Sequence, residues 1–392
     1  MPLSKLTVVD LATLAAAPQI AAFFGDFGAR VIKVEHPRGD SLRRLVDARG
    51  VPLTWKIVNR NKQHVTLDVT KPEGRALLDE MLARADLLVC NLGRERLARF
   101  GLERAHLAAA HPRLVVVNLT AYGTDGPWAE RPGSGTLAEA MSGLAQLVGY
   151  PDRPPLLPPL ALGDNIGAIA GAFAVMTALF HRERTGEGQE IDLALVEPLL
   201  AVLGIQTLVR SVTGISMTRQ GNRVNHLAPR GAWETVDGRW ISVTVGNDNT
   251  FRSLAEAMGM PGLVDEPRFA TNRARLANVD AIEGVLAEWF GRTKFEDAIR
   301  ALESKKVAHA PLYDAEQLLS DPQLTSRRAF VQVEDEELGH ATLPNVIARF
   351  SRTPGEVRYA GRPKGADNGR IYQERLGLTE EEVGELAARR VI

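Results

Sequence analysis

Residues 6–35, LTVVDLATLAAAPQIAAFFGDFGARVIKVE, contain the pattern that decides the fold. The run Leu6–Leu11 predicts a strand, Pro18–Phe27 predicts a helix that ends at Gly28, and Arg30–Glu35 predicts a second strand. This order forms a βαβ unit with parallel strands. The turn after the first strand, ATLAAA (12–17), contains no glycine, so we expect a Rossmann-like topology that does not bind NAD.

The same alternation continues through the first third of the chain. A helix is predicted at Pro72–Ala85, because proline and Glu73 both suit a helix N-terminus. Further strands are predicted at Val65–Leu67, Leu87–Asn91 and Leu114–Leu119. Strands that alternate with helices favour a parallel sheet with helices on its faces, and hence an α/β fold.

The length of 392 residues predicts two domains, since a single core rarely grows that far. We expect a large Rossmann-like domain at residues 1–200 and 328–392, a linker at 201–221 and a smaller α+β domain at 222–327. Within the linker region, Glu197–Val212 predicts one helix. In the smaller domain, Asp237-Gly238 predicts a hairpin between two strands.

Composition indicates an ordinary folded protein. The net charge of −1, with acids and bases interspersed, gives no footprint for nucleic acid. The single cysteine, Cys90, lies in an apolar strand and is expected in the core, and the N-terminus lacks a secretion signal, so we expect a cytoplasmic protein. The apolar run Ile166–Phe180 is too short to cross a membrane, which predicts a buried helix and no membrane partner.

Asp164 precedes this apolar helix and is the expected N-cap. A capping aspartate typically stabilises a helix by about 1 kcal/mol, which by itself explains the residue. The same position also keeps a carboxylate ionised in an apolar pocket, and an ionised carboxylate can attack an acyl carbon. The local sequence is compatible with both roles, because capping does not exclude attack.

Basic residues follow several of the predicted strands. His36 and Arg38 come after the second strand, Arg60-Asn61-Lys62 precedes the next, and Arg96 and Arg99 follow Asn91-Leu92-Gly93. Open α/β sheets bind ligands at the carboxyl ends of their strands, so together these residues predict an anion cradle for a nucleotide diphosphate. Each segment taken alone is equally compatible with a solvated surface turn.

Several other chemistries lack their motifs. HExxH, CxxC and acidic metal-binding loops are absent from the sequence, which predicts no metal. GxSxG is absent as well, so an α/β-hydrolase serine is unsupported.

An ordered series of short motifs resembles family III CoA-transferases. The series covers the first half of the chain, and Asp237-Gly238-Arg239-Trp240 and Asp321-Pro322-Gln323 continue it more loosely. Its members are Val9-Asp10-Leu11, Asp26–Glu35, Arg60-Asn61-Lys62, Leu67-Asp68, Pro72-Glu73-Gly74, Ala85-Asp86-Leu87, Asn91, Gly101-Leu102, Gly123, Gly126-Pro127, Arg131-Pro132-Gly133, Asp164 and Arg184–Gln189.

This resemblance implies that Asp164 is the nucleophile, that coenzyme A is bound, and that the substrates are an acyl-CoA and a small carboxylic acid. The positions that match the family's CoA-binding positions are His36 or Arg38, Leu67 to Thr70, Asn91, Leu92, Gly93 and Arg99. Relatives form interlocked homodimers, so a homodimer is expected by resemblance.

Two alternatives stay open beside CoA transfer. The family's racemase branch, which acts on 2-methylacyl-CoA, uses a histidine in the segment after Arg131-Pro132-Gly133, and here that segment has none. A CoA-ester binding protein without catalysis is the other alternative, although an intact Asp164 counts against it.

The segment 133–143 looks more like members that use succinyl-CoA and short dicarboxylic acids. Arg223, His226 and Arg230 are then candidates for binding a second carboxylate. The family's glycine loop, which shields the intermediate from water, is reduced here to Gly246-Asn247-Asp248-Asn249.

Overall fold

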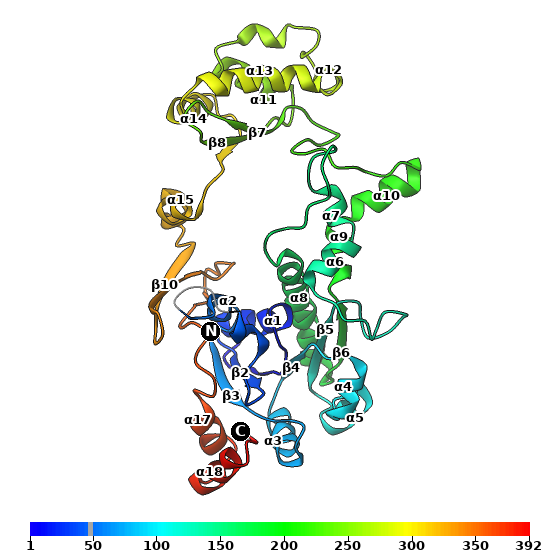
Figure 1. Ribbon diagram of the computed structural model, residues 1–392, viewed down its shortest axis with the longest axis vertical. Coiled ribbons are helices and arrows are strands. Elements are labelled where there is room, and N and C mark those ends of the chain that lie inside the picture. The colour runs from blue at the N-terminus through cyan, green and yellow to red at the C-terminus, as the bar shows by residue number, and fades with distance from the viewer. Residues whose placement is uncertain (46–49) are drawn as a thin grey trace. The chain divides into compact units, whose positions relative to one another are not determined.

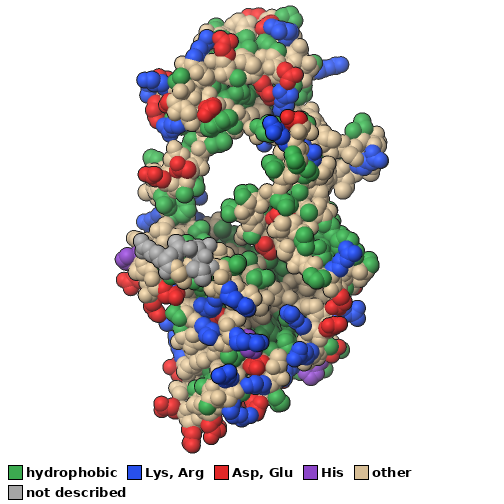
Figure 2. Space-filling model, viewed as in Figure 1, with side chains coloured by type: hydrophobic (Ala, Val, Ile, Leu, Met, Phe, Trp, Pro, Cys, Tyr) green, Lys and Arg blue, Asp and Glu red, His purple; other side chains and the backbone are tan. Residues whose placement is uncertain are grey.

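A computed structural model describes residues 1–45 and 50–392 (Figure 1). The chain forms two compact units. The larger unit comprises Met1–Ala145, Leu157–Ser216 and Pro322–Ile392, and the smaller unit comprises Gln146–Leu156 and Met217–Asp321. Lys and Arg side chains are interspersed with acidic ones on the face drawn in Figure 2.

A six-stranded, fully parallel sheet forms the centre of the larger unit. Its strand order is β3-β2-β1-β4-β5-β6, the order of dinucleotide-binding Rossmann folds. The strands are β1 (Thr7–Asp10), β2 (Arg30–Glu35), β3 (Lys62–Thr66), β4 (Leu87–Cys90), β5 (Val115–Thr120) and β6 (Glu190–Ala194). The βαβ start and the parallel sheet are therefore confirmed.

Helices cover both faces of this sheet, as Figure 1 shows. One face packs on α1 and α8 through a core that includes Ile20, Val117 and Val175, and the other packs on α3 and the C-terminal helices through Leu78, Val116 and Tyr372. The helices of the larger unit are α1 (Ala16–Asp26), α2 (Leu53–Val58), α3 (Pro72–Leu82), α4 (Arg94–Arg99), α5 (Arg104–Ala110), α6 (Gly135–Met141), α8 (Leu162–Thr185), α9 (Val196–Val202), α10 (Gly204–Thr213), α16 (Pro322–Ser326), α17 (Asn368–Glu374) and α18 (Glu380–Ala388). The boundary at Ala145, where the first segment of this unit ends, falls within the short helix α7 (Leu144–Leu147).

The larger unit also contains an antiparallel pair, β10 (Phe330–Asp335) and β11 (Gly339–Pro344). The smaller unit has an antiparallel sheet of order β7-β8-β9, with helices packed on a core that includes Trp233, Phe251 and Phe290. Its elements are β7 (Arg230–Glu234), β8 (Trp240–Thr244), α11 (Asp248–Ala257), α12 (Asn272–Ala277), α13 (Val279–Arg292), α14 (Phe295–Ser304), β9 (His309–Pro311) and α15 (Ala315–Ser320). The predicted fold class, a parallel α/β unit with a smaller α+β unit, is confirmed.

The single helix predicted at Glu197–Val212 is wrong. The structure has two helices, α9 and α10, whose axes differ by 65°. Gly204 is the first residue of the second helix. Glycine inside a helix lowers helix stability by about 1 kcal/mol relative to alanine, so interrupting the helix at Gly204 costs little free energy.

Helix α8 is longer and less buried than predicted. Its 24 residues reach the length and hydropathy of a membrane-crossing helix, so the sequence argument from a short apolar run is wrong. One face, including Gly167, Gly171 and Val175, packs against α1 and the sheet. The opposite face is exposed, and Phe173 on it is 76% accessible. Helix α8 is thus a core helix of this unit with one uncovered apolar face.

Candidate active site

The residues predicted to bind CoA follow β2, β3 and β4, and therefore lie at one edge of the sheet, where the carboxyl ends of these parallel strands meet. His36 Nε2 lies 3.7 Å from Asp68 Oδ2, which shows that the ends of β2 and β3 are adjacent. Arg38 is exposed beside them, and its backbone N–H donates to His36 Nδ1 at 3.0 Å. Arg38 therefore places an exposed guanidinium at this part of the edge.

The strand order reverses between β1 and β4, and Asn91 lies at that point. Its side chain accepts a hydrogen bond from the Thr13 N–H at 3.0 Å and donates to the Thr13 carbonyl at 2.8 Å. In open α/β folds, the crevice at such a reversal is the usual ligand site. Asn91 thus links the loops that follow β1 and β4, and no sequence pattern pointed to its partner Thr13.

The other predicted CoA-binding residues differ in exposure. Leu67 and Leu92 are buried, and the N–H and carbonyl of Leu92 both bond to the Asn118 side chain at 2.9 Å. Gly93 is the N-cap residue of α4, and Arg99, in the last turn of that helix, is exposed. Arg99 therefore has an exposed, positively charged side chain, unlike Leu67, Leu92 and Gly93.

Arg60-Asn61-Lys62 is not part of an anion cradle. Arg60 binds the Asp26 carboxylate with Nε at 3.0 Å and Nη2 at 2.6 Å, and Asn61 donates to the same carboxylate. Lys62 is fully buried, with Nζ 2.8 Å from Asp10 Oδ2. These cations are neutralised by buried carboxylates far away in the sequence, so the prediction that they bind phosphate is wrong.

Asp164 does not cap α8. The helix begins at Leu162, so Asp164 is its third residue, and its side chain makes no capping hydrogen bond. The Gly163 N–H is instead bonded by Glu139 Oε1, at 2.7 Å, from the neighbouring helix α6. Because a buried carboxylate from another helix satisfies this N–H, the Asp164 carboxylate is left available for another role.

Two glycines lie against this pair of carboxylates. A Cβ placed on Gly135, the first residue of α6, would contact Oδ2 of Asp164 and lie 2.6 Å from its Cγ. A Cβ on Gly163 would lie 3.1 Å from Cγ of Glu139 and from the Gly135 carbonyl oxygen. Only glycine at 135 allows the Asp164 carboxylate to occupy its position without a shift.

Burial and the nearby Glu139 carboxylate raise the pKa of Asp164 to about 6. Glu139 is 1% exposed, so its charge is poorly screened from Asp164. At pH 7 a carboxyl group with this pKa is still about nine-tenths ionised. Asp164 is therefore mostly a carboxylate, and a more basic one than an exposed aspartate, as a nucleophile requires.

Asp164 lies at the same edge of the sheet as the loops described above. Helix α8 connects β5 to β6, and Gly167, one turn beyond Asp164, packs against Leu195 and Leu119 near the carboxyl ends of those strands. The first turn of α8 is therefore near the β5–β6 end of this edge. Glu139 and Gly135 were missed as partners of Asp164, and their spacing of four residues on one helix was the available signal.

Among the described residues, no group of three or more His, Cys, Asp or Glu side chains is arranged to hold a metal ion. Cys90 is buried in β4, as predicted, and burial raises the pKa of its thiol well above the usual range. Neither observation adds a reactive group to the Asp164 region. The segment 246–249 contains the N-cap of α11, where Asn247 bonds the Thr250 N–H at 3.0 Å.

Comparison with known proteins assigns the family. The model described as CoA-transferase family III matches residues 3–368. The chain belongs to this family. This family III CoA-transferase is 34% identical to the succinyl-CoA–D-citramalate CoA-transferase of Chloroflexus aurantiacus, over 100% of this chain and 98% of the relative. It is 32% identical to the succinate–glutarate CoA-transferase of Agrobacterium fabrum, over 91% of each chain.

A solved structure agrees with this assignment. The crystal structure of a CaiB/BaiF family protein from Brucella suis superposes with a TM-score of 0.86 and 31% identity, covering 95% of this chain and 99% of that one. The resemblance read from the sequence motifs is confirmed. The protein is a family III CoA-transferase, and its substrates include coenzyme A thioesters.

Proposed function

We propose that this enzyme moves CoA from succinyl-CoA to a short dicarboxylic acid through a covalent thioester on Asp164. The observation that carries the mechanism is the Asp164 carboxylate, which lies in the first turn of α8, has a pKa raised to about 6, and packs against Gly135, where a Cβ would displace it. The choice of succinyl-CoA rests on the names of the two relatives, which both act on succinyl-CoA or succinate.

The reaction begins when an Asp164 carboxylate oxygen attacks the thioester carbon of the donor. The new C–O bond replaces the C–S bond, which gives a mixed anhydride and the CoA thiolate. The thiolate then attacks Cγ of Asp164, which releases succinate and forms the aspartyl-CoA thioester. The steps exchange one acyl bond for another without oxidation, so the energy of the thioester is kept.

The second half of the cycle reverses these steps with the acceptor acid. Its carboxylate attacks Cγ of Asp164 and displaces the CoA thiolate, which leaves an anhydride between Asp164 and the acceptor. The thiolate attacks the acceptor carbonyl, forms the new acyl-CoA, and returns Asp164 to its carboxylate form. Each nucleophile is an anion, so no general base is required.

Glu139 is proposed to position Asp164 rather than to react. Its hydrogen bond to the Gly163 N–H holds the first turn of α8, and its charge raises the basicity of Asp164. A more basic carboxylate is a better nucleophile toward a thioester. Glu139 thereby supports attack without contacting the substrate.

The CoA nucleotide is proposed to bind at the carboxyl edge of the sheet. His36, Arg38 and Arg99 would bind its phosphates, while Leu67, Asn91, Leu92 and Gly93 would line the crevice between the loops. The exposed guanidiniums of Arg38 and Arg99 support this placement, because phosphates favour arginine forks. We propose that residues 1–200 with 328–392 form this CoA-binding domain, joined by linker 201–221 to the smaller domain 222–327.

We further propose a homodimer that works in the cytoplasm. The uncovered face of α8 carries Ile169, Phe173, Met176 and Phe180 at intervals of four, three and four residues, and each is at least 44% exposed. Exposed apolar stripes of this kind mark protein interfaces. Light scattering should give about twice the chain mass of 42.7 kDa, and a mass matching one chain would contradict the proposal.

The site lacks one of the two residues, a histidine, that the racemase branch of the family uses. The segment after Arg131-Pro132-Gly133 has no histidine, and Gly135, next to Asp164, has no side chain at all. A non-catalytic binding protein is disfavoured by the named relatives, which are CoA-transferases. Transfer is therefore the function that the site supports best.

The test is covalent labelling. The enzyme is incubated with succinyl-CoA and then with hydroxylamine, and its peptides are analysed by mass spectrometry. The Asp164 peptide should carry a hydroxamate, whereas Asp280, in the first turn of α13, should not and serves as an internal control. If CoA binds but Asp164 stays unlabelled, the covalent mechanism is wrong.

A further inference from the structure

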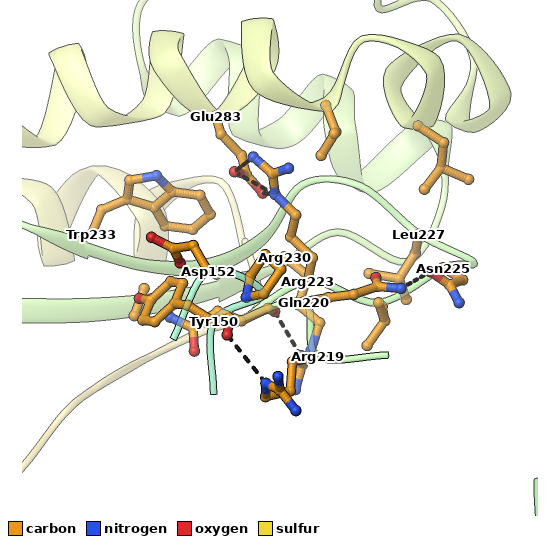
Figure 3. Close-up of a pocket in the computed structure, with 17 residues that line it drawn as sticks. Tyr150, Asp152, Arg219, Gln220, Arg223, Asn225, Leu227, Arg230, Trp233 and Glu283 are labelled. Atoms are coloured by element: carbon orange, nitrogen blue, oxygen red, sulfur yellow. Dashed lines mark hydrogen bonds and ion pairs between the residues drawn. The ribbon is translucent and has the colours of Figure 1, made fainter. Parts of the chain in front are cut away.

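The smaller unit contains a cavity of about 640 Å³ that is lined by residues of this unit (Figure 3). We call it the arginine pocket. It is bordered by the segment 150–152, the loop 219–227, the start of β7 and helix α13. Its volume lies within the range of pockets that bind small molecules. Three arginines line it, Arg219, Arg223 and Arg230.

Arg223 is already neutralised within the protein. Its Nε lies 3.1 Å and 3.0 Å from the two carboxylate oxygens of Glu283, and Nη2 lies 2.6 Å from Glu283 Oε2 and from Asp280 Oδ1. Figure 3 shows this guanidinium turned toward Glu283. A guanidinium with two carboxylate partners has little capacity left for an external anion. The sequence expectation that Arg223 binds a substrate carboxylate is therefore not supported by this geometry.

Arg219 and Arg230 are anchored in a different way. Arg219 donates to the carbonyls of Tyr150 at 3.3 Å and Gln146 at 3.2 Å, and Arg230 donates to the Asn222 carbonyl at 2.7 Å. In the described part of the chain, no carboxylate forms an ion pair with either one. Carbonyl oxygens fix the direction of a guanidinium without cancelling its charge. Both residues therefore keep N–H groups and a full positive charge for an anion.

Arg230 also borders a second hollow, of about 270 Å³, which is lined largely by residues of β7 and β8. There it lies opposite Thr244 in the β7–β8 pairing, and Ser242 lies two pairs further along, opposite Ala232. The paired strands thus offer the Arg230 guanidinium from β7 and the Thr244 hydroxyl from β8, while the Ser242 hydroxyl already donates to the Gly231 carbonyl at 3.1 Å. Such a set of donors suits a carboxylate, which has two acceptor oxygens.

Apolar side chains line part of the arginine pocket, and polar ones such as Gln220 and Asn225 line another part. Trp233, Leu276, Val279 and Val224 line it beside the guanidiniums. Glu283, which lines the pocket, is paired with Arg223. The other lining carboxylate, Asp152, has a side chain that is three-quarters exposed and lies 3.7 Å from Arg153, outside the pocket lining. An apolar wall next to two uncancelled cations favours a short carbon chain that ends in a carboxylate over a polar phosphate group.

We propose that the arginine pocket binds a short free dicarboxylic acid, with Arg230 and Arg219 as the residues that recognise its carboxylate. This inference rests on the proposed function for the identity of the ligand, since the transferase accepts and releases free acids. It assigns binding of the free acid to the smaller unit. Arg230 and Arg219 replace Arg223, which is paired with Glu283 and Asp280, and His226, which does not line the pocket, as the residues proposed to bind a dicarboxylic acid.

The first experiment measures succinate binding to the full-length enzyme, without CoA, by isothermal titration calorimetry. Arg230→Gln and Arg219→Gln should each raise the dissociation constant at least about tenfold, as expected for loss of a charge-assisted hydrogen bond. Arg230→Lys keeps the positive charge but loses the two-pronged guanidinium, so its dissociation constant for succinate should lie between those of wild type and Arg230→Gln. Arg239→Gln is the control, because Arg239 is in the same unit but is paired with Glu296 and stacked on Phe295.

The outcomes separate this inference from the mechanism. End-point labelling of Asp164 at saturating succinyl-CoA should persist in both glutamine variants. If wild-type enzyme is not labelled but succinate binding still depends on Arg230, the covalent mechanism fails and the pocket stands. If succinate binds both glutamine variants as it binds wild type, or if they lose CoA affinity instead of succinate affinity, the pocket proposal is overturned.

Discussion

Replacing Gly135 by alanine should damage the activity while leaving the fold intact. The new Cβ would lie 2.6 Å from Cγ of Asp164, about 0.8 Å inside ordinary contact at 3.4 Å. Asp164 has a short side chain at a helix terminus, so the carboxylate would rotate away before the backbone moved. A displacement near 1 Å of a reacting group costs about 100-fold in rate, or about 2.7 kcal/mol of transition-state stabilisation. We therefore predict a loss of about 100-fold in kcat/KM for CoA transfer.

The matched control is Gly204→Ala. Gly204 is also the first residue of a helix, α10, but a Cβ there has nothing within 4 Å. Both variants should keep the free energy of unfolding within about 1 kcal/mol of wild type, measured by urea denaturation, because alanine suits a helix better than glycine. Only Gly135→Ala should lose activity and Asp164 labelling. Equal activity of the two variants would refute the packing argument.

Three further predictions concern the same site. Glu139→Gln keeps an acceptor for the Gly163 N–H but removes the negative charge, so the pKa of Asp164 should fall. The acid limb of the pH profile of kcat/KM should then move to lower pH. An unmoved limb would show that Glu139 does not act on Asp164 electrostatically. In wild type the folded state binds the Asp164 proton more tightly than the unfolded state, so stability should fall by about 1–2 kcal/mol between pH 4 and pH 6. Asp164→Asn should remove that part of the fall in urea denaturation, and an identical pH dependence in both proteins would mean that the pKa is not raised. Arg99→Gln should raise the dissociation constant of CoA about tenfold and weaken the salt dependence of CoA binding. The control is Arg300→Gln, which removes a surface arginine paired with Asp297 and should leave CoA affinity unchanged. Unchanged CoA affinity in Arg99→Gln would show that Arg99 does not bind the phosphates.

The sheet could be predicted because its signals are local. Arg30–Glu35 is β-rich and bounded by turns, and the structure has a strand with the same ends. Pro72 and Glu73 mark the start of α3 as predicted. Strand order, by contrast, depends on contacts between distant segments, and only the general rule for parallel βαβ units anticipated it.

The surroundings of Asp164 could not be predicted from its neighbours in the chain. The position of Asp164 in the sequence favoured an N-cap. In the structure, the Gly163 N–H in the first turn of α8 donates instead to Glu139, which lies 24 residues upstream of Gly163. The same limit explains Arg60: its partner Asp26 is 34 residues away, and no local pattern distinguishes a buried ion pair from a basic surface turn. Tertiary contacts decide whether a charged residue is free to bind a ligand.

The most direct test of the mechanism is the state of Asp164 during turnover. Wild-type enzyme is mixed with succinyl-CoA, quenched, treated with hydroxylamine and analysed by peptide mass spectrometry beside Asp164→Asn. The mechanism predicts a hydroxamate on Asp164, its loss when a dicarboxylic acceptor is added before the quench, and no labelled peptide in the variant. Full transferase activity in Asp164→Asn, or turnover in wild type without any modified Asp164, would contradict it.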